Sequence, residues 1–132
     1  MPDLVIDTDV ASVLIKRRAE PWITNHLVGN QAWLTFVTVG ELAKWAQVRS
    51  WGIASRHTLD AWIEAQPMIP FDPEIAKLWG RLAGSAQNRG RPRPQNDMWI
   101  AACCIHHDVP LLTINQRDFE DFAKHEGLRL LD

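Results

Sequence analysis

The segment DLVIDTDV, at residues 3–10, places a short apolar run directly before Asp7, Thr8 and Asp9. The apolar residues predict a buried strand over 3–6 that ends at Asp7. A carboxylate at a strand terminus is expected to be half-buried, and a buried carboxylate needs a polar partner. The neighbouring sequence offers no Lys or Arg for this purpose. We therefore single out Asp7 as a candidate functional residue.

Short apolar strands and amphipathic helices alternate along the rest of the chain. Strands separated by helices predict an α/β fold with a mostly parallel central sheet of about four to five strands, flanked by helices on both faces. The expected strands are 3–6, 32–36, 67–71, 111–114 and 128–131. Helices are expected over 21–28, 38–51, 55–65 and 97–107. Three further helices are expected: one that follows the first strand and ends at 16–18, one that begins at Asp72-Pro73, and one that begins at Asp118.

Capping signals predict where several helices begin and end. Thr38 is expected to be an N-cap, with Glu41 as its capping-box partner. Gly52 is expected to end that helix, and Ser55 to cap the next one. Asn96 is expected to cap the helix over 97–107.

The composition is that of one globular domain. The chain has 132 residues, of which 46% are hydrophobic and 23% charged, and its net charge is −2. Its longest apolar run, 98–105, is far shorter than the roughly 20 residues of a membrane span, so no membrane association is expected. The adjacent Cys103 and Cys104 suggest neither a disulfide framework nor a zinc site, and a cytoplasmic location is expected.

Acidic residues from separate segments are expected to converge at one edge of the sheet. In open parallel sheets the ligand site lies beyond the carboxyl ends of the strands. Taken singly, these acids also have structural interpretations, such as a capping box or a favourable helix start. If they converge, their mutual repulsion favours binding of Mg²⁺ or Mn²⁺, and such a site suits phosphodiester hydrolysis. The acids concerned are Asp7, Glu41, Asp97 and Asp118, with Thr113 and Asn115 at the end of the strand over 111–114.

A basic, proline-rich stretch, NRGRPRPQ at 88–95, immediately precedes Asp97. The prolines favour an extended segment. We predict that Arg89, Arg91 and Arg93 contact RNA phosphates at the mouth of the site, with a solvated loop as the alternative.

Four segments together resemble the signature motifs of PIN-domain ribonucleases, in particular the VapC-type toxins of type II toxin–antitoxin pairs. The resemblance spans residues 3–131 and implies a single PIN domain over 1–132. The segments are LVIDTDV at 4–10, TVGEL at 38–42, NDMWIAA at 96–102 and LLTINQRDF at 111–119.

The resemblance implies a role for each site residue. Asp7, Glu41, Asp97 and Asp118 match the catalytic acids, and Asp7, Asp97 and Asp118 match metal ligands for Mg²⁺ or Mn²⁺. Many PIN domains carry Asp at the place of Asn115. Because an amide is a weaker ligand than a carboxylate, this difference counts against a second metal ion. The polar residues expected to line the site are Thr8, Asp9, Thr113 and Asn115.

The resemblance also implies partners. It suggests a metal-dependent endoribonuclease toxin that forms a homodimer and is inhibited by a cognate antitoxin. Trp45, Trp51 and Trp62 would line the antitoxin groove. DNA would be bound only indirectly, through the antitoxin.

Two other functions remain open at this level. Asp7 and Asp9 after an apolar strand also fit the opening of haloacid-dehalogenase-like phosphatases, in which the first Asp is a nucleophile. Alternatively, a PIN-like fold serves as a non-catalytic protein-binding module.

Overall fold

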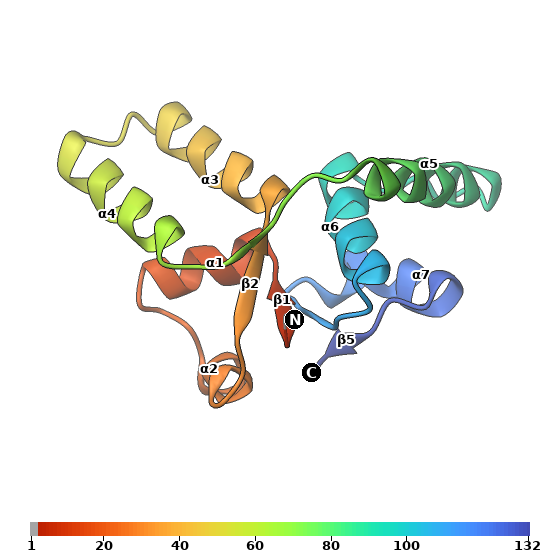
Figure 1. The fold of residues 1–132 in the computed structure, drawn as a ribbon, viewed down its shortest axis with the longest axis horizontal. Helices are drawn as coiled ribbons and strands as arrows, with labels where there is room; N and C mark the ends of the chain where they lie inside the picture. Colours follow the sequence, from red (N-terminus) through yellow and green to blue (C-terminus); the bar gives the residue numbers. More distant parts are fainter. Residues whose placement is uncertain (1–2) are drawn as a thin grey trace.

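The computed structural model describes residues 3–132, and a five-stranded parallel sheet forms its centre (Figure 1). The strands lie in the order β3-β2-β1-β4-β5, and every neighbouring pair is parallel. The predicted parallel sheet is therefore confirmed, although its strands are shorter than expected. They are β1 (Leu4–Ile6), β2 (Ala32–Thr35), β3 (Met68–Ile69), β4 (Leu111–Leu112) and β5 (Leu130–Leu131).

The order of the strands fixes where a ligand can bind. From β1 the chain continues outward to β2 and β3 on one side, and then returns to the other side of β1 to form β4 and β5. The strand order thus reverses beside β1, and the carboxyl ends of strands at such a switch point form a crevice. Asp7, directly after β1, lies at this point.

One face of the sheet is covered by α1 (Thr8–Ile15), α2 (Pro21–Leu27), α3 (Phe36–Val48) and α4 (Ile53–Glu64). The strand residues that pack on this face alternate with those that pack on the other, as the pleat requires. Leu4, Ile6, Leu34 and Leu112 belong to this core.

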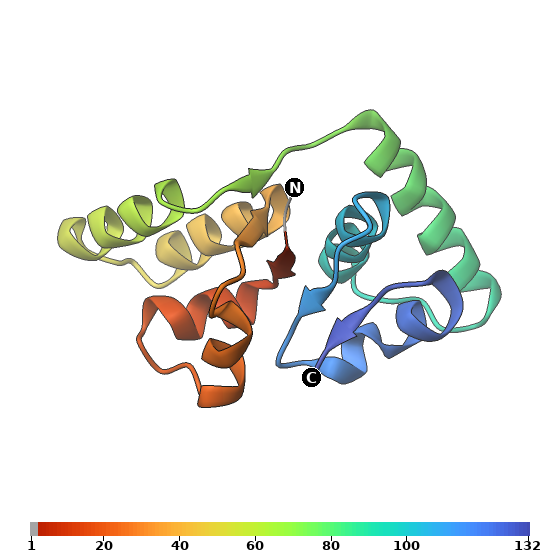
Figure 2. The same cartoon turned by 60° about the horizontal axis from the view of Figure 1, so that its bottom comes forward.

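The opposite face is covered by α5 (Pro73–Asn88), α6 (Gln95–His106) and α7 (Gln116–Glu126). Val5 and Leu111 point into this second core. Figures 1 and 2 show α3 and α4 on one side of the sheet and α5, α6 and α7 on the other. The helices on both faces agree with the predicted architecture.

The start of α3 differs from the prediction in a way that affects the site. Thr35, not Thr38, is the N-cap, and its hydroxyl oxygen accepts the N–H of Thr38 at 3.3 Å. The prediction failed because β2 runs directly into the helix, which begins at Phe36. Thr38 and Glu41 consequently lie inside the helix, and the predicted capping box does not form.

The predicted boundary between α3 and α4 was also wrong. Ser50, with a positive φ of 51°, makes the left-handed turn after α3 that we expected Gly52 to make. Gly52 instead occupies the N-cap position of α4, so Ser55 lies within that helix rather than capping it. The Arg56 side chain closes the corner by donating to the carbonyl oxygens of Trp51 (2.8 Å) and Ala46 (3.1 Å).

Helix α6 begins at Gln95, the last residue of the basic stretch, with Pro94 at its N-cap position. The Met98 N–H donates to the Pro94 carbonyl oxygen at 3.1 Å, so Asn96 is not the cap that we predicted. Asp97 therefore lies in the first turn, where the helix dipole favours negative charge.

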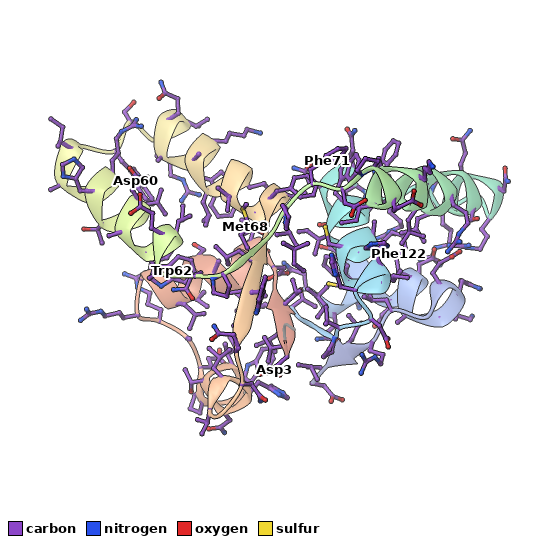
Figure 3. All side chains as sticks on the ribbon, in the orientation of Figure 1. Asp3, Asp60, Trp62, Met68, Phe71 and Phe122 are labelled. Carbon is purple, nitrogen blue, oxygen red and sulfur yellow. The ribbon has the colours of Figure 1, made fainter. Side chains whose placement is uncertain are left out.

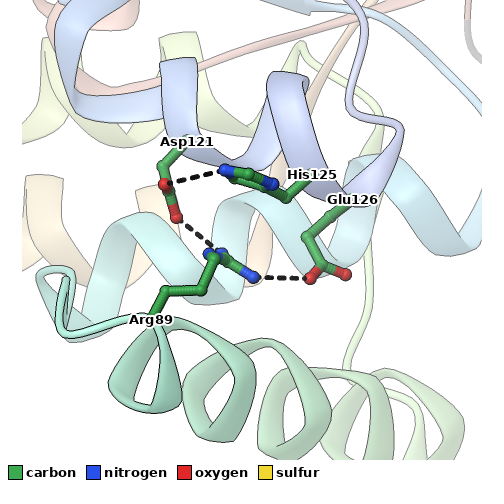
Figure 4. Close-up of polar contacts among 4 residues, drawn as sticks. All are labelled: Arg89, Asp121, His125 and Glu126. Carbon is green, nitrogen blue, oxygen red and sulfur yellow. Dashed lines mark hydrogen bonds and ion pairs between the residues drawn. The ribbon is translucent and has the colours of Figure 1, made fainter.

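An arginine-centred network joins the end of α5 to α7 (Figure 4). The guanidinium of Arg89 donates to Asp121 at 2.6 Å and to Glu126 at 3.1 Å, and His125 lies 3.8 Å from Asp121. Burial acts to raise the pKa of Asp121, but the hydrogen bond and charge of Arg89 outweigh it, and the pKa is lowered. The predicted RNA contact of Arg89 must therefore compete with two carboxylates that already bind it.

This network predicts that Arg89→Ala destabilises the fold. The buried Asp121 carboxylate loses its counter-charge, so the midpoint of thermal unfolding should fall by several degrees at neutral pH. The loss should shrink in acid, as Asp121 is protonated. Lys77→Ala, which breaks the exposed pair with Glu74, is the matched control and should leave the midpoint nearly unchanged. Equal midpoints for the two variants would contradict the structural role of Arg89.

Candidate active site

Asp7 connects the central strand to the first helix. It is 4% exposed and is the N-cap of α1, where its Oδ1 accepts the N–H of Val10 at 2.9 Å. Its Oδ2 accepts a hydrogen bond from the Thr113 hydroxyl, which follows the neighbouring strand β4. Both donors are neutral, so the negative charge of Asp7 is solvated by hydrogen bonds but not neutralised.

A chain of hydroxyl groups positions Glu41. The Thr8 hydroxyl donates to Glu41 Oε1 at 2.6 Å and lies 3.0 Å from the Thr38 hydroxyl. Because the single Thr8 hydrogen is used for Glu41, Thr38 acts as donor to Thr8. This chain links α1 to α3 and orients the Glu41 carboxylate. Thr38 was not predicted to have this role, although its spacing of three residues from Glu41 places both on one helix face.

The third and fourth acids come from helices on the other face of the sheet. Asp97 is in the first turn of α6, and Asp118 is in the first turn of α7. The guanidinium of Arg93 lies 3.9 Å from Asp118. Arg93 thus extends from the basic stretch to the carboxylates, and its own side chain is only 18% exposed.

Asp9 and Asn115 form a direct side-chain pair, in which the Asn115 amide donates to the Asp9 carboxylate. The Asn115 backbone N–H also donates to Thr113 Oγ1 at 3.0 Å. Thr113 therefore connects Asn115 to Asp7.

Most of these residues line one cavity of about 160 Å³, whereas Thr38, Arg93 and the fully buried Thr113, which we predicted to line the site, are not part of its wall. Ile100 and Phe119 complete its wall although we did not single them out; they lie three residues after Asp97 and one after Asp118. Trp45, which we assigned to a partner groove, also lines it. The predicted site residues in the cavity are Asp7, Thr8, Asp9, Glu41, Asp97, Asn115 and Asp118.

Burial, together with the crowding of like charges, raises the pKa of two of these acids. Burial, followed by the charges of Asp9 and Asp97, raises the pKa of Asp7 to about 6, although its two hydrogen bonds act against this. Burial also raises the pKa of Asp97 to about 6, and the charges of Asp118, Glu41 and Asp9 add to the shift, while Arg93 opposes it. The cavity therefore holds more negative charge than Arg93 balances.

A hard cation suits this donor set, which consists of carboxylate and amide oxygens. Within residues 3–132, however, no three His, Cys, Asp or Glu side chains are arranged as a ready metal-binding group. The chemistry of the residues fits a divalent ion, whereas a closed ligand cage is not formed among them.

The remaining predicted residues, apart from Trp45, lie outside the cavity. Arg91 is exposed at the end of α5. Trp45, Trp51 and Trp62 are partly buried against the core formed with α1 to α4, and Trp51 lines a shallow hollow with Ile15 of α1. Figure 3 shows Trp62 on α4. No helix in the described part of the chain is long and apolar enough to cross a membrane.

Comparison with known proteins identifies the fold. Ribonuclease VapC5 of Mycobacterium tuberculosis is 29% identical over 129 residues, covering 93% of this chain and 87% of that protein. Ribonuclease VapC1 of Haemophilus influenzae is 24% identical over 119 residues, covering 88% and 89%.

Solved structures have the same architecture. DNA-bound VapBC from Salmonella typhimurium matches with a TM-score of 0.83 at 23% identity, over 100% of this chain and 98% of that one. VapBC-5 from Mycobacterium tuberculosis matches with a TM-score of 0.69 at 24% identity, over 98% of both chains. The family model described as PIN domain matches residues 4–125. With this match over nearly its whole length, and with its acids gathered at the switch point of a five-stranded parallel sheet, the chain belongs to the PIN domain family.

Proposed function

We propose that this chain is a metal-dependent endoribonuclease and the toxin of a type II toxin–antitoxin pair, with residues 1–132 forming one PIN domain. The observation that carries the proposal is the gathering of Asp7, Glu41, Asp97 and Asp118, from four separate segments, around one cavity. The similarity to ribonucleases VapC5 and VapC1 supports the same activity.

Asp7, Asp97 and Asp118 are the residues that we expect to hold Mg²⁺ or Mn²⁺. The raised pKa values of Asp7 and Asp97 support this, because a bound cation would relieve the repulsion that causes part of the shift. Such an ion supplies a more acidic bound water and neutralises charge that develops on a phosphate. Asn115 is a weaker ligand than a carboxylate, which favours one strongly held ion over two.

Glu41 is suited to accept the proton of the attacking water. Its carboxylate is oriented by a hydrogen bond from the Thr8 hydroxyl at 2.6 Å, whereas the Arg93 guanidinium lies 3.9 Å from Asp118, too far for an orienting hydrogen bond. In the proposed hydrolysis, the water oxygen forms a bond to phosphorus as the bond from phosphorus to the 3′ oxygen breaks. The departing oxygen takes up a proton from solvent water and becomes a 3′-hydroxyl, and the other product carries a 5′-phosphate.

RNA phosphates would approach from the side of the basic stretch. Arg93 lies next to Asp118, and Arg91 is exposed two residues earlier. Positive charge beside the acids offsets the repulsion between an RNA strand and the carboxylates. This supports phosphate contacts for Arg91 and Arg93, whereas Arg89 is held by Asp121 and Glu126.

We further propose that a cognate antitoxin occupies the side of α3 and α4 that carries Trp45, Trp51 and Trp62. Trp45 lines both that side and the catalytic cavity, so a segment bound there lies close to the acids. An arginine of the antitoxin would suit the carboxylates as a substitute for the metal. The DNA-bound VapBC complexes support a toxin–antitoxin assembly that binds DNA. We propose in addition that this chain forms a homodimer and that the antitoxin contacts the DNA.

The two other functions considered from the sequence have less support. Asp9 is paired with Asn115, and the chain belongs to the PIN family, neither of which favours a phosphatase with an aspartyl nucleophile. A non-catalytic binding module would have no need for four acids around one cavity.

Cleavage is predicted to depend on both metal and Asp97. Purified protein incubated with total cellular RNA and Mg²⁺ or Mn²⁺ should release discrete fragments, and EDTA should abolish them. Asp97→Asn should reduce the rate by at least about a hundredfold, because it removes a charged ligand and its hold on the ion. Asp60→Asn, the same change on the exposed surface of α4 (Figure 3), is the control and should cleave like the wild type.

Two outcomes would overturn the ribonuclease proposal. One is undiminished cleavage by Asp97→Asn. The other is a folded wild-type protein that neither cleaves RNA nor binds Mn²⁺, which would favour the binding module.

The acids also predict how pH and metal affect stability. Because the pKa values of Asp7 and Asp97 lie near 6 in the fold instead of 3.8, the metal-free folded chain binds more protons than the unfolded chain between about pH 4 and pH 6. Its free energy of unfolding should therefore fall as the pH rises through this range. At about pH 7.5 in EDTA, Asp97→Asn should be more stable than the wild type by on the order of 1 kcal/mol, allowing for solvent screening.

Added Mn²⁺ should reverse this order. It should raise the thermal midpoint of the wild type above about pH 6, where both carboxyls are ionised, and have little effect near pH 4. The midpoint of Asp97→Asn should respond much less. If Mn²⁺ raised the thermal midpoint equally at all pH values, or equally in the wild type and Asp97→Asn, metal binding at these acids would be contradicted.

A further inference from the structure

A second hollow, of about 400 Å³, lies between the C-terminal end of α5 and the exposed side of α7. We name it the α5–α7 pocket. The side chains that line it are all charged or titratable, and four of them are cations: Arg89, Arg91, Arg117 and Lys124.

The α5–α7 pocket carries a positive charge although the chain as a whole carries −2. Only two carboxylates, Glu120 and Asp121, line it, and Asp121 is already paired with Arg89. This leaves Arg91, Arg117 and Lys124 exposed around the single exposed acid Glu120. Such a surface attracts an anion.

The floor and rim of the pocket are fixed by the fold. Figure 4 shows Arg89 lying between α5 and α7, where it contacts Asp121 and Glu126. Gly90 follows with a positive φ of 73°, and the next N–H, that of Arg91, donates to the Ala86 carbonyl oxygen at 2.9 Å. The backbone of Arg91 is thereby held at the rim, so only side chains must be ordered there when an anion binds.

The pocket adjoins the catalytic cavity through α7. Arg117 lines the pocket, while the next two residues, Asp118 and Phe119, line the cavity. Along the helix, Arg117 and Lys124 are about 10 Å apart, at 1.5 Å per residue. That is the length of about three stacked nucleotides of one strand.

We infer that the α5–α7 pocket binds the phosphates of the RNA strand next to the phosphate that is cut. This inference rests on the proposed ribonuclease function and adds Arg117 and Lys124 to the residues that bind RNA. Arg and Lys side chains of this kind contact the phosphate backbone, and the one aromatic ring in the lining, that of His125, lies 3.8 Å from Asp121. The pocket therefore contributes affinity for RNA of any sequence and leaves the choice of cleavage site to other residues.

The test compares two double variants that each remove two positive charges. Arg117→Gln with Lys124→Gln alters the pocket. Lys77→Gln with Arg81→Gln alters a different hollow on α5 and serves as the control. Binding of a fluorescent single-stranded RNA is measured in EDTA as a function of salt, with Asp97→Asn added to both so that the RNA stays intact. Thermal unfolding establishes that both variants are folded.

In the pocket variant, loss of two phosphate contacts should make the slope of log association constant against log salt concentration shallower by about 1.4. The slope of the control variant should equal that of the protein without the double substitution. With Asp97 restored, the pocket variant should cleave with a KM about tenfold higher, at the same positions and with a similar kcat. Equal slopes in the two double variants would overturn the inference.

These results separate the inference from the function on which it rests. Cleavage by the wild type together with equal slopes would overturn the pocket alone. A shallower slope for the pocket variant without any cleavage by the wild type would overturn the ribonuclease and leave the pocket as an RNA-binding surface. RNA that fails to bind at all would overturn both.

Discussion

Burial of the Asp7 carboxylate at the end of the central strand is the constraint around which this structure is organised. The charge is held by the first turn of α1 and by the Thr113 hydroxyl beyond β4, so strand, helix and neighbouring strand must meet in one register. Hydrogen bonds from neutral donors make the burial tolerable but do not cancel the charge, and the pKa remains raised. The local fold is therefore built to hold a carboxylate that hydrogen bonding alone leaves uncompensated.

The same constraint links stability to chemistry. Asp97, Glu41 and Asp118 add like charges around the cavity, and Arg93 is the cation placed against them. Replacing these three acids by amides would relieve that repulsion and stabilise the domain, so the cation binding that we propose explains why they are gathered here. A cation and a phosphate bring the opposite charges that the metal-free cavity lacks.

The two faces of the sheet present different surfaces beside this cavity. The side of α3 and α4 offers partly buried tryptophans, suited to a protein partner, and Trp45 reaches the cavity wall from there. The side of α5 and α7 offers arginines and a lysine, suited to a nucleic-acid backbone. Because both surfaces meet at the carboxyl edge of the sheet, the antitoxin that we propose on one face would lie beside the path that we propose for RNA on the other.

The sequence by itself determined the alternation of strands and helices, the parallel sheet and the identity of the acids, because periodicity and strand ends are local properties. It misjudged both ends of α3 and the start of α6, where Thr35, Ser50 and Pro94 do what Thr38, Gly52 and Asn96 were expected to do. Only the tertiary structure decided that Thr38 orients Glu41 through the Thr8 hydroxyl. It also decided that Arg89 binds two acids of α7, whereas Arg93 faces Asp118. Finally, it placed Arg117 and Lys124 beside Arg91 in the α5–α7 pocket. These contacts join residues far apart in the chain, and the packing of helices on the sheet, which local pattern does not specify, brings them together.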